Sequence, residues 1–188
     1  STLVIDGGDT SIWMNMARTN HRPGGTLEPG LFGCLGVGLP FAVAAKLNRP
    51  ERRVFCVVGD GSLGFNFMEL HTALRFKLPI VVVVNNDQAW GMVLHSHELR
   101  FGKGRCPGLD LGYVPYHKLV EALGGYGEEV KEPDQIRPAL ERAARADTCA
   151  LVNVLTDQEV ISPGSVALAA IGQRELPVDA LAQDGAGY

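Results

Sequence analysis

Five short apolar runs, several of them rich in valine, alternate along this chain with segments patterned for α-helix. The runs are Leu3 to Asp6, Val54 to Val58, Ile80 to Asn85, Gly127 to Val130 and Ala150 to Leu155. Near-continuous hydrophobicity is typical of strands buried on both faces, and strands that alternate with helices pair in parallel. We therefore predict an α/β fold, a doubly wound parallel sheet with helices on both faces.

The expected helices lie between these runs. They cover Ser11 to Arg18, Gly36 to Leu47, Phe67 to Phe76, Tyr116 to Leu123 and Pro133 to Ala146. Two spans fit neither pattern and are predicted to be irregular. One runs from Asp87 to Pro115 with five glycines and two prolines, and the other is the small-residue tail from Gln158. We expect one domain over residues 1–157 and a C-terminal arm or tail over 158–188.

The composition restricts the partners of this chain. Its 188 residues, 46% of them hydrophobic, suffice for one well-cored domain. A net charge of -4 and a pI near 5.7 leave no broad basic surface, so nucleic acid is not an expected partner. Since the sequence has no spanning apolar run and no signal-peptide pattern, we expect a soluble, cytoplasmic protein without a membrane partner.

The four cysteines also fit the expectation of a cytoplasmic protein. Cys34, Cys56, Cys106 and Cys149 are scattered and form no C-x-x-C pair. This spacing fits neither a zinc site nor a disulfide framework. We expect reduced thiols.

Polar and glycine residues follow three of the predicted strands. Gly7 to Thr10 follows the first, Gly59 to Ser62 the second, and Asn85 to Asp87 ends the third. In open α/β sheets, ligands bind beyond the carboxyl ends of the strands, where glycines let the backbone approach a phosphate. These three turns are therefore the candidate binding site.

The turn from Gly59 to Gly64 reads Gly-Asp-Gly-Ser-Leu-Gly, which satisfies the dinucleotide fingerprint. In that interpretation Asp87 would be the ribose acid of a dehydrogenase. However, the Asp60 carboxylate would lie beside an anionic pyrophosphate, and like charges repel unless a cation lies between them. The sequence thus favours a metal-bridged phosphate.

Mg²⁺ takes about six oxygen ligands, commonly from one or two protein groups together with phosphate and water. Asp60 and Asn86 supply two from adjacent strand ends, and a main-chain carbonyl just past Asn86, that of Gln88, could supply a third. The alternative is that Asp60 and Asn86 merely cap backbone groups in their turns. That alternative explains each residue singly and leaves their pairing unexplained.

The combination of Gly59-Asp60-Gly61 with Asn85-Asn86, 26 residues from aspartate to second asparagine, resembles the signature of thiamine diphosphate enzymes. From about Val4 to Val154 the chain is similar to the acetolactate synthase, benzaldehyde lyase and 2-hydroxyacyl-CoA lyase branch. Further matching stretches are Gly33 to Gly38, Met68 to Ala73 and Asn85 to Gly91.

The resemblance implies thiamine diphosphate and Mg²⁺ as cofactors, with Asp60, Asn86 and the Gln88 carbonyl as metal ligands. The groups that it implies around the diphosphate are, in chain order, Asp9, Thr10, Gly59, Gly61, Ser62, Asn86, Gly91 and Met92. It assigns the carbonyl of Gly33 to the aminopyrimidine, and it makes Leu35 the apolar wedge that holds the cofactor bent, so that the amino group meets the reactive carbon.

One element of the family pattern is not in this sequence. The family activates the cofactor with a glutamate from an N-terminal pyrimidine-binding domain of a neighbouring subunit. The start at Ser1 favours an excised C-terminal piece, and a separate partner chain is the alternative. The resemblance thus implies that partner domain, a homo-oligomer, and a small keto acid or acyl substrate. It also implies that the isolated chain is inactive.

Several residues keep a structural alternative. For Leu35 the alternative is ordinary core packing, and for Gly33, Gly36 and Gly38 it is that they only permit close helix packing. His95 and His97 are expected to be exposed loop residues, since no third ligand lies nearby. Met92 and Leu94 are expected in an apolar pocket wall, and Trp90 is expected under the loop.

We thus predict an enzyme that makes or breaks a carbon–carbon bond next to a carbonyl, by decarboxylation and carboligation of 2-keto acids or by 2-hydroxyacyl cleavage. A non-catalytic cofactor-binding or assembly module is the alternative from another class, and a partner domain with the glutamate would distinguish the two. An NAD-binding dehydrogenase domain is a more distant alternative.

Overall fold

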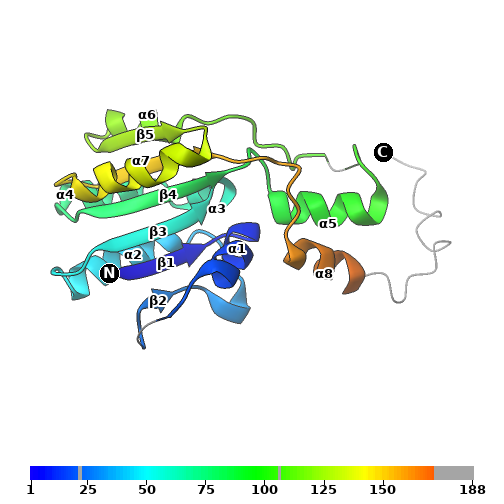
Figure 1. Cartoon of the computed structure of the whole chain (residues 1–188), viewed down its shortest axis with the longest axis horizontal. Helices are drawn as coiled ribbons and strands as arrows, with labels where there is room; N and C mark the ends of the chain where they lie inside the picture. Colours follow the sequence, from blue (N-terminus) through cyan, green and yellow to red (C-terminus); the bar gives the residue numbers. More distant parts are fainter. Residues whose placement is uncertain (21–22, 106, 172–188) are drawn as a thin grey trace.

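The computed structural model describes residues 1–171 with the exception of 21, 22 and 106. Its strands form one parallel sheet in the order β2-β1-β3-β4-β6-β5 (Figure 1). The strands are β1 (Thr2–Asp6), β2 (Thr26–Leu27), β3 (Val54–Gly59), β4 (Ile80–Asn86), β5 (Tyr126–Val130) and β6 (Ala150–Leu155). All five predicted strands are present, and the predicted fold class is confirmed.

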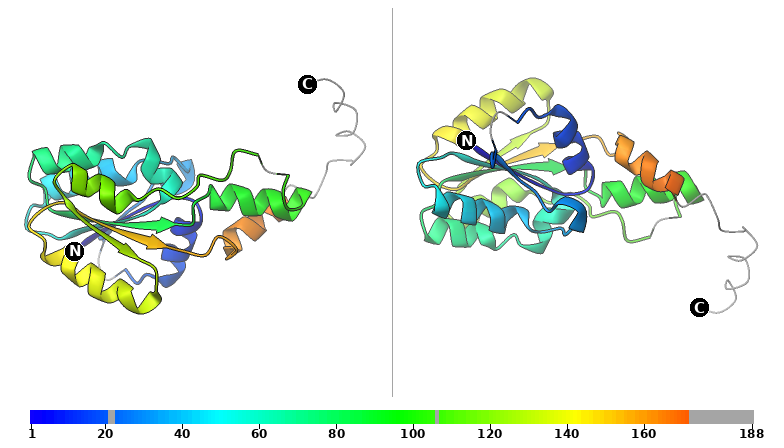
Figure 2. Two further views of the ribbon diagram at one scale, coloured as in Figure 1. Left: turned by 90° about the horizontal axis from the view of Figure 1, so that it is seen from above. Right: turned by 90° about the horizontal axis from the view of Figure 1, so that it is seen from below.

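Helices cover both faces of this sheet, and two further helices, α5 and α8, lie beyond its end (Figure 2). The helices are α1 (Asp9–Ala17), α2 (Gly38–Asn48), α3 (Asp60–Phe65), α4 (Glu69–Arg75), α5 (Gly91–Phe101), α6 (Tyr116–Ala122), α7 (Pro133–Arg145) and α8 (Pro163–Ile171), with a short 3-10 turn η1 (Gly30–Phe32). The five predicted helices are found with shifts of a few residues at their ends.

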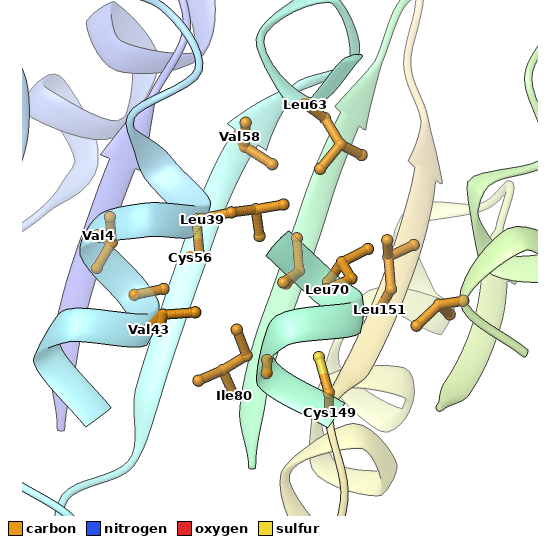
Figure 3. Close-up of a cluster of buried hydrophobic side chains, with 14 of the residues drawn as sticks. Val4, Leu39, Val43, Cys56, Val58, Leu63, Leu70, Ile80, Cys149 and Leu151 are labelled. Atoms are coloured by element: carbon orange, nitrogen blue, oxygen red, sulfur yellow. The ribbon is translucent and has the colours of Figure 1, made fainter. Parts of the chain in front are cut away.

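Alternation along the central strands divides the core into two layers. Cys56, Val82 and Leu151 face α2, α4 and α6 in the larger layer (Figure 3). Their neighbours Val81 and Val152 face the other side, where α7 covers them. Because successive strand side chains point to opposite faces, the apolar runs must be continuous to fill both layers. This requirement explains the pattern that predicted the sheet.

Two predictions about irregular segments were wrong. The span from Asp87 to Pro115 contains the eleven-residue helix α5, and the tail from Gln158 contains α8. These two helices pack against each other beyond the end of the sheet (Figure 1). The five glycines between 87 and 115 had indicated a loop there, and the small residues after Gln158 had indicated a tail. Residues 172–188 of the predicted tail lie outside the described residues, and the domain division after residue 157 stays a prediction.

Within the described residues, no helix is long and apolar enough to cross a membrane. Three of the cysteines can be placed. Cys34 is exposed, whereas Cys56 and Cys149 are free thiols in the core. Burial raises the pKa of both core thiols, that of Cys149 to about 12, so they remain protonated. Cys106 lies outside the described residues.

Candidate functional site

A cavity of about 440 Å³ lies over the carboxyl ends of β1, β3 and β4. Its position matches the point where the strand order reverses, since β2 lies on one side of β1 and β3 on the other. The three turns singled out from the sequence all contribute to its lining, through Gly7 to Thr10, Gly59 to Ser62, and Asn85 with Asp87. Parallel pairing thus brings together turns that are up to about 80 residues apart in the sequence.

The turn after β1 requires glycine. Gly7 has a φ of 120°, and a Cβ there would lie 3.1 Å from the backbone nitrogen of Gly59. The next residues start α1 at Asp9, and the turn after β3 starts α3 at Asp60. The first backbone N–H groups of a helix have no partner within the helix. Two such helix starts therefore face one cavity, in an arrangement suited to anions.

Asp60 is held next to a second carboxylate. Its side chain is only 3% exposed and accepts a hydrogen bond of 2.8 Å from the backbone nitrogen of Gly61. Burial, together with the nearby negative charge of Asp87, raises the pKa of Asp60, and burial also raises the pKa of Asp87. A buried carboxylate beside a second, half-buried carboxylate is stabilised by a cation or by a proton. The pair is therefore a fitting place for a divalent metal ion.

Asn86 is fully buried at the end of β4. Its side-chain nitrogen donates to Asn153 Oδ1 at 3.0 Å and to the carbonyl of Val114 at 3.4 Å. These two acceptors fix the amide, and Asn86 Oδ1 accepts a bond of 3.2 Å from the backbone nitrogen of Gln88. An amide oxygen has two lone pairs, so Asn86 retains the capacity to bind a cation.

The segment after β4 has a constrained backbone. Gln88 adopts a φ of 63°, which non-glycine residues rarely do. Its carbonyl accepts a hydrogen bond of 2.8 Å from the backbone nitrogen of Leu111, and Trp90 donates to the carbonyl of Leu109 at 2.9 Å. The chain from 109 to 111 therefore holds this turn in place. The carbonyl of Gln88 has one lone pair left for a further ligand.

Among the described residues, no group of three or more histidine, cysteine, aspartate or glutamate side chains is placed to hold a metal ion. The candidate set predicted from the sequence is of another kind. It combines one carboxylate with an amide and a main-chain carbonyl, which are the oxygen ligands suited to Mg²⁺.

Thr10 and Ser62 line the same cavity as buried hydroxyl groups. Thr10 Oγ1 accepts a hydrogen bond of 3.1 Å from the side chain of Asn85. This contact joins the start of α1 to the end of β4 across the intervening strand β3. Asn85, which the sequence analysis had not assigned a role, is thus a positioned residue of the cavity.

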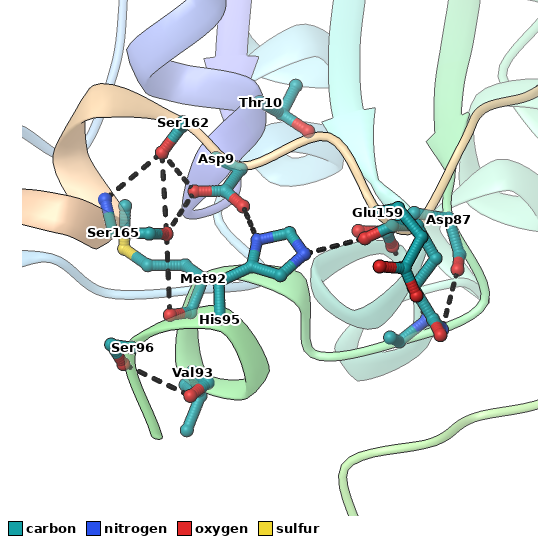
Figure 4. A network of polar contacts seen from close by, with 12 residues as sticks. Asp9, Thr10, Asp87, Met92, Val93, His95, Ser96, Glu159, Ser162 and Ser165 are labelled. Atoms are coloured by element: carbon teal, nitrogen blue, oxygen red, sulfur yellow. Dashed lines mark hydrogen bonds and ion pairs between the residues drawn. The ribbon is translucent and has the colours of Figure 1, made fainter. Parts of the chain in front are cut away.

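The carboxylate of Asp9 does not point freely into the cavity. It accepts hydrogen bonds from the hydroxyls of Ser162 and Ser165, the latter at 2.8 Å, and it contacts His95 Nδ1 at 3.0 Å (Figure 4). The backbone of Asp9, at the start of α1, remains the group suited to a phosphate. Sequence reasoning found Asp9 but missed the three residues that hold its side chain.

The prediction that His95 is an exposed loop residue was wrong. His95 lies on α5 and is 3% exposed, whereas His97 is exposed as expected. The two histidines are two positions apart on a helix, so their side chains point in different directions. The same spacing on a strand would have placed them on one face. The signal that could have identified His95 is its place four residues after the buried Gly91, on the same side of α5.

Gly33 and Leu35 line the cavity at the end that adjoins η1. Leu35 is 37% exposed and belongs to neither core layer, so the alternative of ordinary core packing is not supported. Gly36 follows with a φ of 84°, and a Cβ there would lie 2.6 Å from Phe65 Cβ. Close packing therefore explains Gly36, while Gly33 has no neighbouring atom that would exclude a side chain.

Gly91 and Met92 begin α5 on the opposite side of the cavity. A Cβ on Gly91 would lie 2.2 Å from Asp87 Oδ2, so only glycine fits beside the acidic pair. Trp90 lines the cavity and packs against Phe65, with ring centroids 5.6 Å apart. Met92 forms part of an apolar wall, as predicted, and Leu94 does not line the cavity.

Comparisons with known proteins agree with this geometry. Residues 6–154 match the family model described as thiamine pyrophosphate enzyme, C-terminal TPP binding domain. A probable acetolactate synthase of Mycobacterium bovis is 43% identical over 161 residues, which are 86% of this chain and 29% of the relative. A 2-hydroxyacyl-CoA lyase of Oryza sativa is 36% identical over 159 residues, covering 82% of this chain and 28% of the relative.

A solved structure is similar as well. The thiamine diphosphate-dependent 4-hydroxybenzoylformate decarboxylase of Rhodococcus jostii RHA1 superposes with a TM-score of 0.75 at 30% identity. The match covers 84% of this chain and 29% of that protein. The chain thus spans less than a third of the length of each of these relatives.

Proposed function

This chain belongs to the thiamine pyrophosphate enzymes, as the C-terminal domain that binds thiamine pyrophosphate, and on that premise we propose the reaction and the site of the whole enzyme. The enzyme forms or cleaves a carbon–carbon bond next to a carbonyl. Its substrates are 2-keto acids, as in the acetolactate synthases, or 2-hydroxyacyl compounds, as in the lyases that this chain is similar to. Bound thiamine diphosphate supplies the nucleophilic carbon and the electron sink for this chemistry.

The diphosphate is held through Mg²⁺. Asp60, Asn86 and the carbonyl of Gln88 supply three oxygens, and the diphosphate and water complete the coordination. The observation that carries this proposal is the carboxylate of Asp60, which is 3% exposed at the end of β3 and lies beside the negative charge of Asp87, so that a cation would stabilise it.

The remaining diphosphate oxygens face backbone N–H groups. The starts of α1 and α3 present Asp9, Thr10, Gly61 and Ser62, and the glycines at 7 and 59 let the chain approach closely. The hydroxyls of Thr10 and Ser62 are further donors. On the other side Gly91 and Met92 close the cavity.

Gly33 and Leu35 would hold the organic part of the cofactor. The partly exposed Leu35 supports a role as an apolar wedge under the cofactor, and the carbonyl of Gly33 is an acceptor for the amino group of the pyrimidine. These groups bind and orient the cofactor. The carboxylate that activates the pyrimidine comes from the pyrimidine-binding domain of a neighbouring subunit, so the working enzyme is an oligomer. We place this enzyme in the cytoplasm.

The test is cofactor binding by the complete enzyme with and without Asp60. Calorimetric titration with thiamine diphosphate should show tight binding only in the presence of Mg²⁺, and Asp60→Ala should abolish it. Asp134→Asn, which removes an exposed carboxylate from the first turn of α7, is the matched control and should bind like wild type. Retained tight binding by Asp60→Ala would contradict the metal assignment, and preferential binding of NAD would contradict the cofactor.

A further inference from the structure

His95 is a buried residue that none of the roles above explains. It lies between two elements far apart in the sequence (Figure 4). Its Nδ1 is 3.0 Å from Asp9 Oδ2 at the start of α1, and its Nε2 is 2.6 Å from the carbonyl oxygen of Gln158, after β6. The side chain therefore connects the candidate diphosphate turn with the chain that leads into α8.

Both partners of His95 are hydrogen-bond acceptors. A main-chain carbonyl has no proton to give, and the Asp9 carboxylate already accepts from the hydroxyls of Ser162 and Ser165. Both ring nitrogens therefore face oxygen acceptors, and a hydrogen bond on each side of the ring ties His95 to both elements.

The nearby charged groups leave this pairing intact. On the segment after β6, the Glu159 carboxylate is bound to Lys103 Nζ, which turns it away from the imidazole. Asp87 contacts the same segment through its main-chain carbonyl, which accepts a bond of 3.1 Å from Gln158 Nε2. Asp9 is thus the carboxylate that pairs with His95.

The segment that His95 holds supports the apolar wall of the cavity. A Cβ added to Gly164 on α8 would lie 2.7 Å from Ile12 Cγ1 and 3.5 Å from Met92 Cε. Ile12 and Met92 both line the cavity, and α8 lies directly behind them. Ser165 Oγ also reaches the carbonyl of Met92, at 3.5 Å. A shift of this segment would therefore release the wall.

We propose that His95 is a positioning residue, which locks residues 158–165 to Asp9 and thereby fixes the Ile12–Met92 wall that receives the apolar part of the substrate. The lock is formed by the two hydrogen bonds of His95 and by the two serine hydroxyls on Asp9. This inference rests on the proposed function, because the cavity is taken to be the thiamine diphosphate and substrate site.

The first test is hydrogen–deuterium exchange of the complete enzyme. In His95→Gln the side-chain nitrogen can donate to only one of the two acceptors, so peptides covering 158–171 should exchange at least about ten times faster, with β3 and β4 unchanged. His97→Gln, two residues along the same helix and exposed, is the matched control and should behave as wild type. Equal protection of 158–171 in His95→Gln and wild type would overturn the lock.

The second test separates positioning from general stability. His95→Gln should raise the KM for the 2-keto acid substrate about tenfold, with kcat changed less than about twofold. The Kd for thiamine diphosphate should rise less than the KM, because His95 holds the side chain of Asp9 and not its backbone N–H. Ser165→Ala removes one hydroxyl from Asp9 and should show the same pattern more weakly. It serves as the second variant if His95→Gln does not fold. An unchanged KM in both variants would overturn the role of the wall. Failure of wild type to bind thiamine diphosphate with Mg²⁺ would instead refute the proposed function.

Discussion

The two ends of the cavity differ in how completely this chain builds them. At the ends of β3 and β4, Asp60 and Asn86 are buried, and side chains or backbone groups of the same chain fix them. At the other end, around η1, Leu31 and Phe32 are almost fully exposed, and Leu35 is partly so. Exposed large apolar side chains gathered in one place indicate a surface that another molecule covers.

The difference shows how the proposed site is divided between domains. The metal and diphosphate end needs rigid oxygen ligands, and strand ends provide them without outside help. The pyrimidine end needs a second wall, and the exposed residues of η1 fit a face that the neighbouring N-terminal domain completes. The following experiments, from the largest expected effect to the smallest, are designed to break or sharpen this contrast.

The largest effect is expected when the partner domain is removed. The isolated 188-residue chain should show no measurable lyase or ligase turnover with excess thiamine diphosphate and Mg²⁺, a loss of at least about 10⁴-fold, because acid–base assistance and substrate positioning are both lost. The assay is repeated after addition of the N-terminal domain. Activity of the chain alone would show that it carries its own catalytic base.

Removal of Asp60 should affect cofactor binding almost as strongly. Asp60→Ala in the complete enzyme should weaken the binding of thiamine diphosphate by about 10³-fold in the presence of Mg²⁺, about 4 kcal/mol. The reason is that the buried pair of metal ion and carboxylate loses the carboxylate. Without metal, Asp60→Asn should be no less stable than wild type in thermal unfolding, since it removes the repulsion from Asp87. A marked loss of apo stability in that variant would argue that Asp60 is mainly structural.

A core substitution and a surface substitution test the contrast in stability. Leu70→Ala, in the larger core layer, should lower the free energy of unfolding by about 3 kcal/mol, because it leaves a cavity in close-packed surroundings. Phe32→Ala should change it by less than about 0.5 kcal/mol in the isolated chain, since that ring packs against nothing there. Urea denaturation measures both. A large effect of Phe32→Ala would mean that η1 belongs to the folded core.

A modest effect on turnover is expected at Leu35. Leu35→Ala should lower kcat about tenfold and weaken thiamine diphosphate less than about threefold, because a wedge organises the reactive geometry and supplies only part of the contact. Steady-state kinetics and titration separate the two quantities. Equal losses in kcat and in affinity would identify Leu35 as a packing residue.

The sequence was informative where one residue pattern has one structural solution. The valine-rich runs could only be strands covered on both faces, and their polar ends had to meet because parallel strands end at the same edge. Asp60, Thr10 and Ser62 were placed in one cavity on this ground, and the structure brings them together. The pairing of Gly59-Asp60-Gly61 with Asn85-Asn86 was specific enough to indicate the family.

The helices beyond the sheet were predicted poorly for a physical reason. α5 and α8 pack against each other, a long-range contact that no local pattern reveals, and the five glycines between 87 and 115 suggested a loop. β2 was missed because two residues carry no periodicity. His95 was misassigned with α5, since its burial depends on a partner segment about 60 residues away.

The amino-acid sequence by itself determined the parallel sheet and the three turns at its edge, because these follow from local pattern and strand direction, and it is the basis of the proposed oxygen ligands for a metal-bridged diphosphate. Only the tertiary structure decided which groups remain available in that site. It engages the Asp9 carboxylate with His95 and two serines, presses Asp87 against Asp60, and leaves Leu35 uncovered. Such contacts join residues about 30 to 160 positions apart, and they are set by packing that no local pattern encodes.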